Sequence, residues 1–282
     1  MTNKIASWSH SKLAEFEKCK YRVFLMHVEK VPEPQRPLRP GQTEHANDRG
    51  SRIHDGAEHF VRGTGPFLPE MEKFRPEFEA LSKLFAAGKV SLEGEWGMNK
   101  NWESAPWSGQ WEELGSAGRI SEIAKGIKVK KVGALPQRGR DGDFAQVGKV
   151  VHAWVSPWFR LKLDALVFLS PTEAVAIDYK TGRKFGNEVK HAEQLQLYQL
   201  VTFLRYPELE IITTELWYLD QDEITSTPFT RFQGLRFRQR FDSRGKALTT
   251  CTEFPPNANL FSCKWCQYGP WGSGHCQVGV QK

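Results

Sequence analysis

The sequence predicts an α/β protein in which helices flank a central mixed β-sheet. Residues 160–169 and 175–180 are apolar, β-branched runs separated by a short turn, which is typical of a β-hairpin. Residues 190–201 repeat apolar side chains at helical spacing, and residues 210–219 form a further strand-like run rich in β-branched and aromatic residues. The order hairpin, helix, strand allows the last strand to join the same sheet.

The second strand of the predicted hairpin ends in Asp178, Tyr179 and Lys180. Because side chains alternate along a strand, Asp178 and Lys180 are expected on one face and Tyr179 on the other. A carboxylate and an ammonium group side by side at a strand end can hold a divalent metal ion and a water molecule together. A solvated surface ion pair is the alternative interpretation of the same pattern.

Asp164 lies in the middle of the first strand of the hairpin, flanked by Leu163 and Leu166. Burying an acid among such neighbours is costly without a metal ion or another partner. The hairpin is expected to bring Asp164 towards Asp178 and Lys180. These three side chains therefore form the candidate catalytic group.

Composition indicates a soluble intracellular protein with a polyanionic partner. The chain has 282 residues, a formal net charge of +6 and five cysteines. We find no run of membrane-spanning length and no secretory leader, so we expect a cytoplasmic protein that does not contact membranes. In a reducing compartment the cysteines favour metal or redox chemistry over disulfides.

The N-terminal third is predicted to be mostly helical. Ser9 is a good N-cap for a helix or helix pair. A proline-rich connector follows, and Gly50 is expected to open the next helix, in which His59 has a structural or solvated role. Residues 66–90 are predicted to form one or two helices, and residues 90–98 a strand.

Residues 99–159 are expected to be an insertion within the core. The segment combines tryptophans with basic residues, a composition that suits single-stranded DNA. The alternative is a solvated loop or a packing elaboration. Residues 132–148 are expected to form a loop, and residues 150–155 a strand or short helix. The residues concerned are Trp102, Trp107, Trp111, Lys125, Lys128, Lys130, Lys131, Arg138 and Arg140.

Three cysteines near the end of the chain have metal-ligand spacing. Cys263 and Cys266 form a Cys-x-x-Cys pair, in which two thiolates one turn apart can grip one ion, and Cys276 follows. Thiolates without paired histidines favour an iron–sulfur cluster, although His275 keeps zinc as an alternative. Cys251 is interpreted as structural.

The hairpin motif resembles motifs II and III of the RecB-like branch of the PD-(D/E)xK nucleases, which includes AddB-type and CRISPR-associated exonucleases. Asp164 and the sequence Ile-Asp178-Tyr-Lys180-Thr-Gly carry this resemblance. Gly50-x-x-x-His54, followed by a helix, is similar to motif I. The resemblance implies a restriction-endonuclease-like core in which His54, Asp164, Asp178 and the carbonyl of Tyr179 bind metal.

The same resemblance implies further residues. Cys19 matches the first ligand of a [4Fe–4S] cluster completed by Cys263, Cys266 and Cys276, so that residues 1–30 and 251–282 form a clasp within a single nuclease domain, 1–282. Gln194 and Tyr198 match a helical motif that contacts DNA. Either Glu93 or Glu95, on one strand face, matches an acid that precedes the first metal-binding aspartate.

We therefore expect a DNA exonuclease that uses Mg²⁺ or Mn²⁺ and acts on ends or single strands in recombination, repair or CRISPR adaptation. Oxygen ligands suit both ions, and a histidine favours Mn²⁺. A helicase, a recombinase or a CRISPR adaptation protein is the expected protein partner, in a prokaryotic or phage-infected cell. The alternatives are a non-cleaving DNA-binding protein with the same fold and a zinc-stapled endonuclease.

Overall fold

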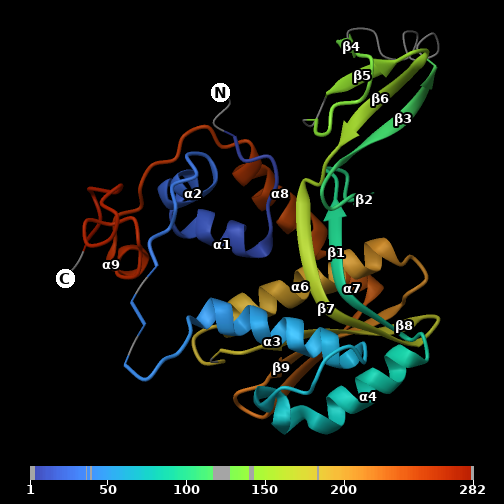
Figure 1. Ribbon diagram of the computed structural model, residues 1–282, viewed down its shortest axis with the longest axis vertical. Coiled ribbons are helices and arrows are strands. Elements are labelled where there is room, and N and C mark those ends of the chain that lie inside the picture. The colour runs from blue at the N-terminus through green and yellow to red at the C-terminus, as the bar shows by residue number, and fades with distance from the viewer. Residues whose placement is uncertain are drawn as a thin grey trace. The chain divides into compact units, whose positions relative to one another are not determined.

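The computed structural model describes residues 4–35, 37–38, 40–116, 128–139, 143–182 and 184–280, without the side chain of Glu93 (Figure 1). The chain divides into two compact units. One comprises residues 1–5, 9–94 and 162–282, and the other comprises residues 6–8 and 95–161. No helix within these described ranges is long and apolar enough to cross a bilayer.

A six-stranded mixed sheet confirms the predicted fold class. Its strand order is β10-β9-β8-β7-β1-β2. Strands β7 and β8 pair antiparallel as the predicted hairpin, whereas β8 and β9 pair parallel because helix α6 (Glu188–Arg205) connects them. The strands are β1 (Val90–Met98), β2 (Ser104–Ala105), β7 (Phe159–Ser170), β8 (Glu173–Lys180), β9 (Ile211–Tyr218) and β10 (Glu223–Thr230).

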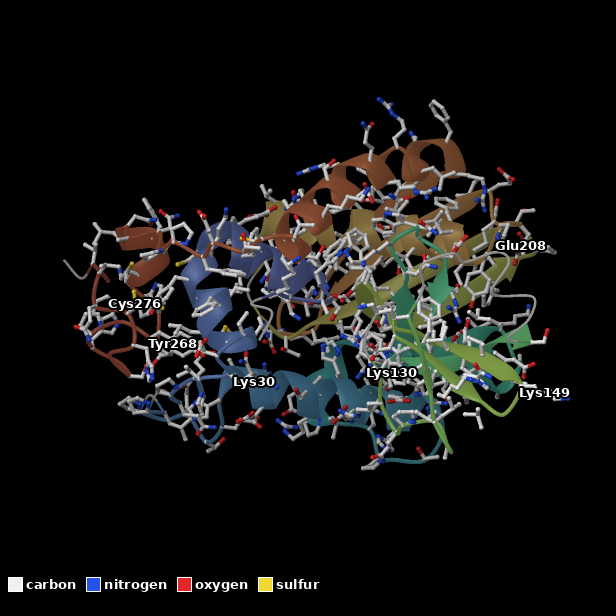
Figure 2. The ribbon with its side chains drawn as sticks, turned by 90° about the horizontal axis from the view of Figure 1, so that it is seen from above. Lys30, Lys130, Lys149, Glu208, Tyr268 and Cys276 are labelled. Atoms are coloured by element: carbon white, nitrogen blue, oxygen red, sulfur yellow. The ribbon has the colours of Figure 1, made fainter. Side chains whose placement is uncertain are left out.

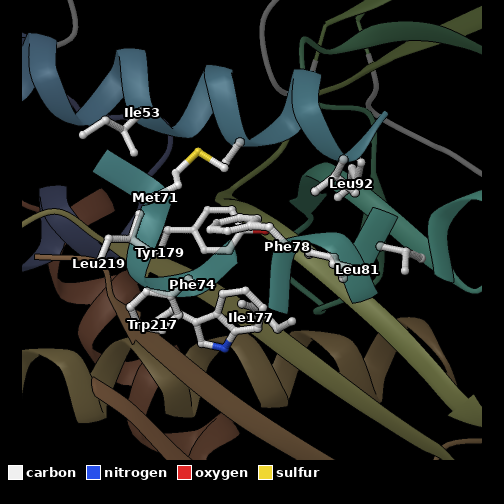
Figure 3. Packing of buried hydrophobic residues seen from close by; sticks show 14 of the residues in the cluster. Ile53, Met71, Phe74, Phe78, Leu81, Leu92, Ile177, Tyr179, Trp217 and Leu219 are labelled. Carbon is white, nitrogen blue, oxygen red and sulfur yellow. The ribbon is translucent and has the colours of Figure 1, made fainter. Parts of the chain in front are cut away.

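Helices α3 (Ala46–Val61), η1 (Pro69–Phe74) and α4 (Arg75–Ala86) supply a large part of the main core. Figure 3 shows Phe78 of α4 packed against Tyr179 and Trp217 of the sheet, with Ile53 of α3 near them. The ring centroid of Phe78 lies 5.1 Å from the ring centroid of Tyr179 and 5.4 Å from that of Trp217. The side chain of Tyr179 is therefore part of the core, as alternation along the strand predicted.

Helix α3 begins at Ala46, so the prediction that Gly50 opens it was wrong. A Cβ atom at Gly50 would lie 3.4 Å from the side-chain oxygen of Thr181. The glycine therefore allows α3 to approach the end of strand β8 closely, and helix initiation is left to the preceding residues. His59 bonds the carbonyl of Asp55 at 2.6 Å, in keeping with a structural role.

Helix α6 packs against strand β9 and contacts helices α7 (Arg231–Leu235) and α8 (Phe237–Thr249). Its buried side chains include Leu197, Leu200 and Phe203, which gives it the predicted amphipathic character. Strand β10 was not predicted, because residues 223–230 contain several polar residues and a proline. Such a sequence is tolerated here because β10 lies at the sheet edge.

Helices α1 (His10–Lys18) and α2 (Lys20–His27) form the predicted N-terminal pair, and the side chain of Ser9 caps α1 by accepting from the N–H of Lys12. The short helix α9 (Leu260–Cys263) docks on the end of α1. Ser262 donates to the carbonyl of Lys18 at 3.1 Å, and Asn257 donates to the same carbonyl at 3.0 Å. The two ends of the chain are thus joined.

The second unit contains a four-stranded sheet in the order β3-β6-β5-β4. The prediction of a loop over residues 132–148 is wrong at its end, because residues 144–147 pair with β6 through a turn in which Gly148 has φ of +60°. Lys125 and Arg140 lie outside the described residues. The strands are β3 (Gln110–Ser116), β4 (Val129–Lys131), β5 (Phe144–Val147) and β6 (Val150–Val155).

Aromatic residues build the core of this second unit. Trp102 is 3% exposed and packs edge-to-face on Trp8 and Trp158, so it serves packing. Trp111 packs on Trp154 at 5.5 Å between ring centroids. The cations Lys128, Lys130, Lys131, Arg138 and Lys149 are exposed.

Candidate active site

The β7–β8 hairpin aligns the two predicted catalytic aspartates. Ala165 lies opposite Ile177, so continuing the antiparallel register by one residue places Asp164 opposite Asp178. Both are buried, with 6% and 4% of their surface exposed. Burying an ionised carboxylate costs several kcal/mol unless other groups compensate for the lost hydration. Each aspartate therefore needs contacts that offset this cost.

Asp164 is held by one contact from its own hairpin and one from helix α3. The backbone N–H of Tyr179 donates to one carboxylate oxygen at 2.7 Å, and Nδ1 of His54 lies 2.9 Å from the other. An ionised carboxylate can only accept, so Nδ1 is the donor and Nε2 of a neutral His54 keeps its lone pair. The structure thus brings together His54 and Asp164, which are 110 positions apart in the sequence.

Asp178 and Lys180 form an ion pair on the same side of strand β8. Gln194 of helix α6 bridges the two groups, because its carbonyl oxygen accepts from Lys180 at 3.0 Å and its amide donates to Asp178 at 3.2 Å. The hydroxyl of Tyr198 donates to the same Asp178 oxygen at 2.5 Å. The predicted Gln-x-x-x-Tyr pair therefore contacts the carboxylate of Asp178 directly.

Burial, hydrogen bonds and nearby charges shift the pKa values of two of these groups. Burial would lower the pKa of His54, but the hydrogen bond to Asp164 and the charges of Asp164 and Asp178 outweigh it and raise the pKa. Burial, followed by the charges of the two aspartates, raises the pKa of Tyr198 well above its ordinary value. Tyr198 therefore stays protonated and remains a hydrogen-bond donor to Asp178.

Sequence reasoning missed His191, which lies three residues before Gln194 and on the same side of α6. Its Nδ1 lies 2.8 Å from the hydroxyl of Tyr218, the residue paired with Lys180 in the parallel register. Burial and then the charge of Lys180 lower the pKa of His191 to about 4. The three-residue spacing between His191 and Gln194 is the sequence feature that could have identified His191.

Arg49 is a second residue that sequence reasoning missed. Its guanidinium pairs with both carboxylate oxygens of Asp220, at 3.0 and 2.8 Å, and donates to the carbonyl of Thr181 at 3.1 Å. Gln221 donates to the carbonyl of Gly182 at 2.9 Å. These contacts fix the backbone that follows strand β8, and no sequence motif indicated them.

The donor set of this site fits a hard divalent cation. Within the described ranges, no three His, Cys, Asp or Glu side chains form a ready-made metal group. However, Oδ2 of Asp178 is buried and accepts no hydrogen bond of regular geometry from the described residues, so the Lys180 ammonium balances its charge. Two carboxylates and the imidazole of His54 are suitable ligands for Mg²⁺ or Mn²⁺.

The role predicted for Glu93 or Glu95 of strand β1 remains a prediction. Glu95 is exposed, and the side chain of Glu93 lies outside the described residues. The metal-binding role of the Tyr179 carbonyl remains a prediction.

Four cysteines line one small cavity at the joined chain ends. Cys19 comes from the start of α2, and Cys263, Cys266 and Cys276 come from the C-terminal segment. Figure 2 shows Cys276 near Tyr268, whose carbonyl accepts from the Cys276 N–H at 2.7 Å. Burial, together with the neighbouring cysteines, raises the pKa of the Cys276 thiol. The fifth cysteine, Cys251, does not line this cavity, and its thiol contacts the carbonyl of Glu253 at 3.0 Å.

Comparisons with known proteins agree with the hairpin motif. No curated protein matches the chain. Among solved structures, one titled "Crystal structure of SSO0001" is 14% identical over 99% of this chain and 89% of that chain, with a TM-score of 0.37, which is too low to support any inference. The family model described as the PD-(D/E)XK nuclease superfamily matches residues 7–271. The chain therefore belongs to the PD-(D/E)XK nuclease superfamily.

Proposed function

We propose that the protein is a metal-dependent DNA exonuclease of the RecB-like branch, which hydrolyses phosphodiester bonds at DNA ends or in single strands. The observation that carries this proposal is the convergence of His54, Asp164, Asp178 and Lys180 at one end of the β7–β8 hairpin. Two buried acids, an imidazole and an ammonium are the groups that metal-assisted phosphate hydrolysis requires.

Asp164, Asp178 and His54 are the residues that would hold Mg²⁺ or Mn²⁺. When bound, the ion supplies a water of lowered pKa and neutralises charge on the scissile phosphate. Asp164 is already oriented by the Tyr179 N–H and His54 Nδ1, so Nε2 of His54 is the imidazole nitrogen left for the ion.

Lys180 supplies positive charge where the phosphate becomes more negative in the transition state. Its ammonium group is fixed by Asp178 and by the Gln194 carbonyl oxygen, so it needs little reorganisation. Tyr198 stays protonated and, with Gln194, holds Asp178 in one orientation. Strand β8 and helix α6 thus preorganise this part of the site before DNA binds.

A cleavage assay tests this function. Labelled DNA, either free-ended or blocked at both ends, is incubated with the protein and Mg²⁺ or Mn²⁺. We expect progressive shortening of free-ended DNA and its loss in Asp178→Ala. Glu173→Ala is the matched control because Glu173 is an exposed acid at the start of the same strand. Cleavage that persists in Asp178→Ala would refute the proposed site.

The same assay separates the alternatives. Binding without cleavage in either metal would indicate a DNA-binding protein that has kept the nuclease fold. Products of fixed length from end-blocked DNA would indicate an endonuclease. A requirement for an added helicase, recombinase or CRISPR adaptation protein would identify the kind of partner.

We propose further that Cys19, Cys263, Cys266 and Cys276 bind a [4Fe–4S] cluster that joins the chain ends. The proposal is supported by their shared cavity, since four thiols from both ends can supply the complete ligand set of such a cluster. Anaerobic purification is expected to give a brown protein with iron and sulfide in equal amounts. Cys263→Ser should lose both, whereas Cys251→Ser should retain them. Zinc without iron would favour the alternative ligand, with His275 as a candidate.

A further inference from the structure

The exposed surface of helix α9 and of the turn after it has the properties of a nucleic-acid contact. Ser262 and Cys263 are buried at 7% and 8%, whereas Phe261 and Trp265 are 90% and 52% exposed. Phe261 belongs to α9, and Trp265 lies in the turn that follows the end of the helix at Cys263. Two large aromatic side chains on either side of Cys263 in the sequence are therefore exposed to solvent.

Hydrogen bonds hold the backbone around the two aromatic residues in place. Asn259 caps α9 by accepting from the Ser262 N–H at 2.9 Å. The Ser262 hydroxyl and the Asn257 amide both bond the carbonyl of Lys18. The aromatic side chains are therefore exposed on a segment whose backbone is held by hydrogen bonds. Such preorganisation reduces the entropy lost when a flat ligand binds.

Two cations accompany the aromatic residues. The Lys264 ammonium lies over the Trp265 ring, with Nζ 5.2 Å from the ring centroid. The carbonyl of Lys18 anchors α9, and both Lys18 and Lys264 are exposed. Neither lysine forms an ion pair with the described residues, so both charges are available to an anion. Exposed aromatic rings, together with cations that form no ion pair with the described residues, match the unpaired bases and phosphates of a single strand.

We propose that Phe261 and Trp265 form a platform on which unpaired bases of the DNA substrate stack, while Lys18 and Lys264 contact the adjoining phosphates. The platform is separate from the catalytic residues. It gives the enzyme a preference for single-stranded regions that does not depend on base sequence, because every base has a stackable face. The proposal rests on the proposed function, since it names the form of the substrate.

The test compares an oligo(dT) with an abasic strand of equal length, by fluorescence anisotropy and without added divalent metal. The full chain carries Asp178→Asn so that cleavage does not interfere. We expect the parent to prefer oligo(dT). Phe261→Ala/Trp265→Ala should bind oligo(dT) at least about fivefold more weakly for each aromatic removed, and should lose the preference over the abasic strand.

Salt dependence separates stacking from charge. The aromatic variant should keep the parent's slope of log Kd against log salt, whereas Lys18→Ala/Lys264→Ala should reduce it by about 0.7 for each lysine. Leu169→Ala is the control because Leu169 is 57% exposed and has no aromatic ring. It should bind both strands as the parent does.

An unchanged preference for oligo(dT) in the aromatic variant would overturn the platform, and so would an equal loss of affinity for both strands. A matching loss in Leu169→Ala would also overturn it. Binding as expected, in a protein whose wild-type form cleaves no DNA with any metal, would leave the platform standing while refuting the nuclease assignment. The two proposals therefore fail separately.

Discussion

Replacing Tyr198 by Phe removes a hydroxyl that donates to Asp178 and accepts from the amide of Gln194. The substitution removes only the hydroxyl, which donates to the buried oxygen of Asp178 at 2.5 Å. The ring stays, so the packing of the 3% exposed side chain is retained. Gln194 still donates to the same oxygen at 3.2 Å, and Asp178 therefore keeps one of these two donors.

The expected cost follows from the charge and burial of the acceptor. A hydrogen bond to a charged group contributes about 1.5–3 kcal/mol to stability, compared with about 0.5–1.5 kcal/mol for a neutral one. Tyr198→Phe should therefore lower the free energy of unfolding by about 2 kcal/mol at neutral pH. Cleavage should also slow, because the carboxylate is held by fewer contacts.

The assay is urea unfolding of Tyr198→Phe, Asp178→Asn and the double variant, which together form a double-mutant cycle. Tyr268→Phe is the matched control because its hydroxyl, on a side chain 1% exposed, donates to the uncharged carbonyl of Val31 at 2.9 Å. We expect a coupling energy of at least about 1 kcal/mol between Tyr198 and Asp178. Effects that add within about 0.5 kcal/mol would refute the contact as the source of the loss.

Two further predictions concern stability. Arg231 donates to the carbonyls of Phe203, Tyr206 and Leu209 at 3.0, 2.8 and 2.8 Å, so Arg231→Ala should lower the free energy of unfolding by about 3 kcal/mol and Arg231→Lys by less, as measured by urea unfolding. An equal loss of unfolding free energy in Arg231→Lys and Arg231→Ala would contradict the role of the three hydrogen bonds. Burial and then the charge of Lys12 lower the pKa of His27 to about 4, from 6.5. The unfolded chain therefore binds more protons between these values, and stability should fall as the pH is lowered from 6.5 towards 4. His27→Gln should flatten this slope relative to the parent, and an unchanged slope would contradict the lowered pKa of His27.

The sequence by itself determined the hairpin, the helix that follows it and the class of sheet. Local patterns were sufficient here, because alternation along β8 already separates Asp178 and Lys180 from Tyr179, and helical spacing already places Gln194 next to Tyr198. The same patterns failed at polar strands such as β10, whose residues carry little apolar signal because an edge strand needs less burial. They also failed at the start of α3, where Gly50 serves a close approach to Thr181.

Only the tertiary structure decided which distant residues meet. His54 reaches Asp164 because α3 packs against the sheet, and Arg49 reaches Asp220 and Thr181 for the same reason. Such contacts depend on the packing of layers over large sequence separations, about which local periodicity carries no information. The packing of the two chain ends likewise brings Cys19 into the cavity of the C-terminal cysteines and leaves Phe261 and Trp265 exposed to solvent.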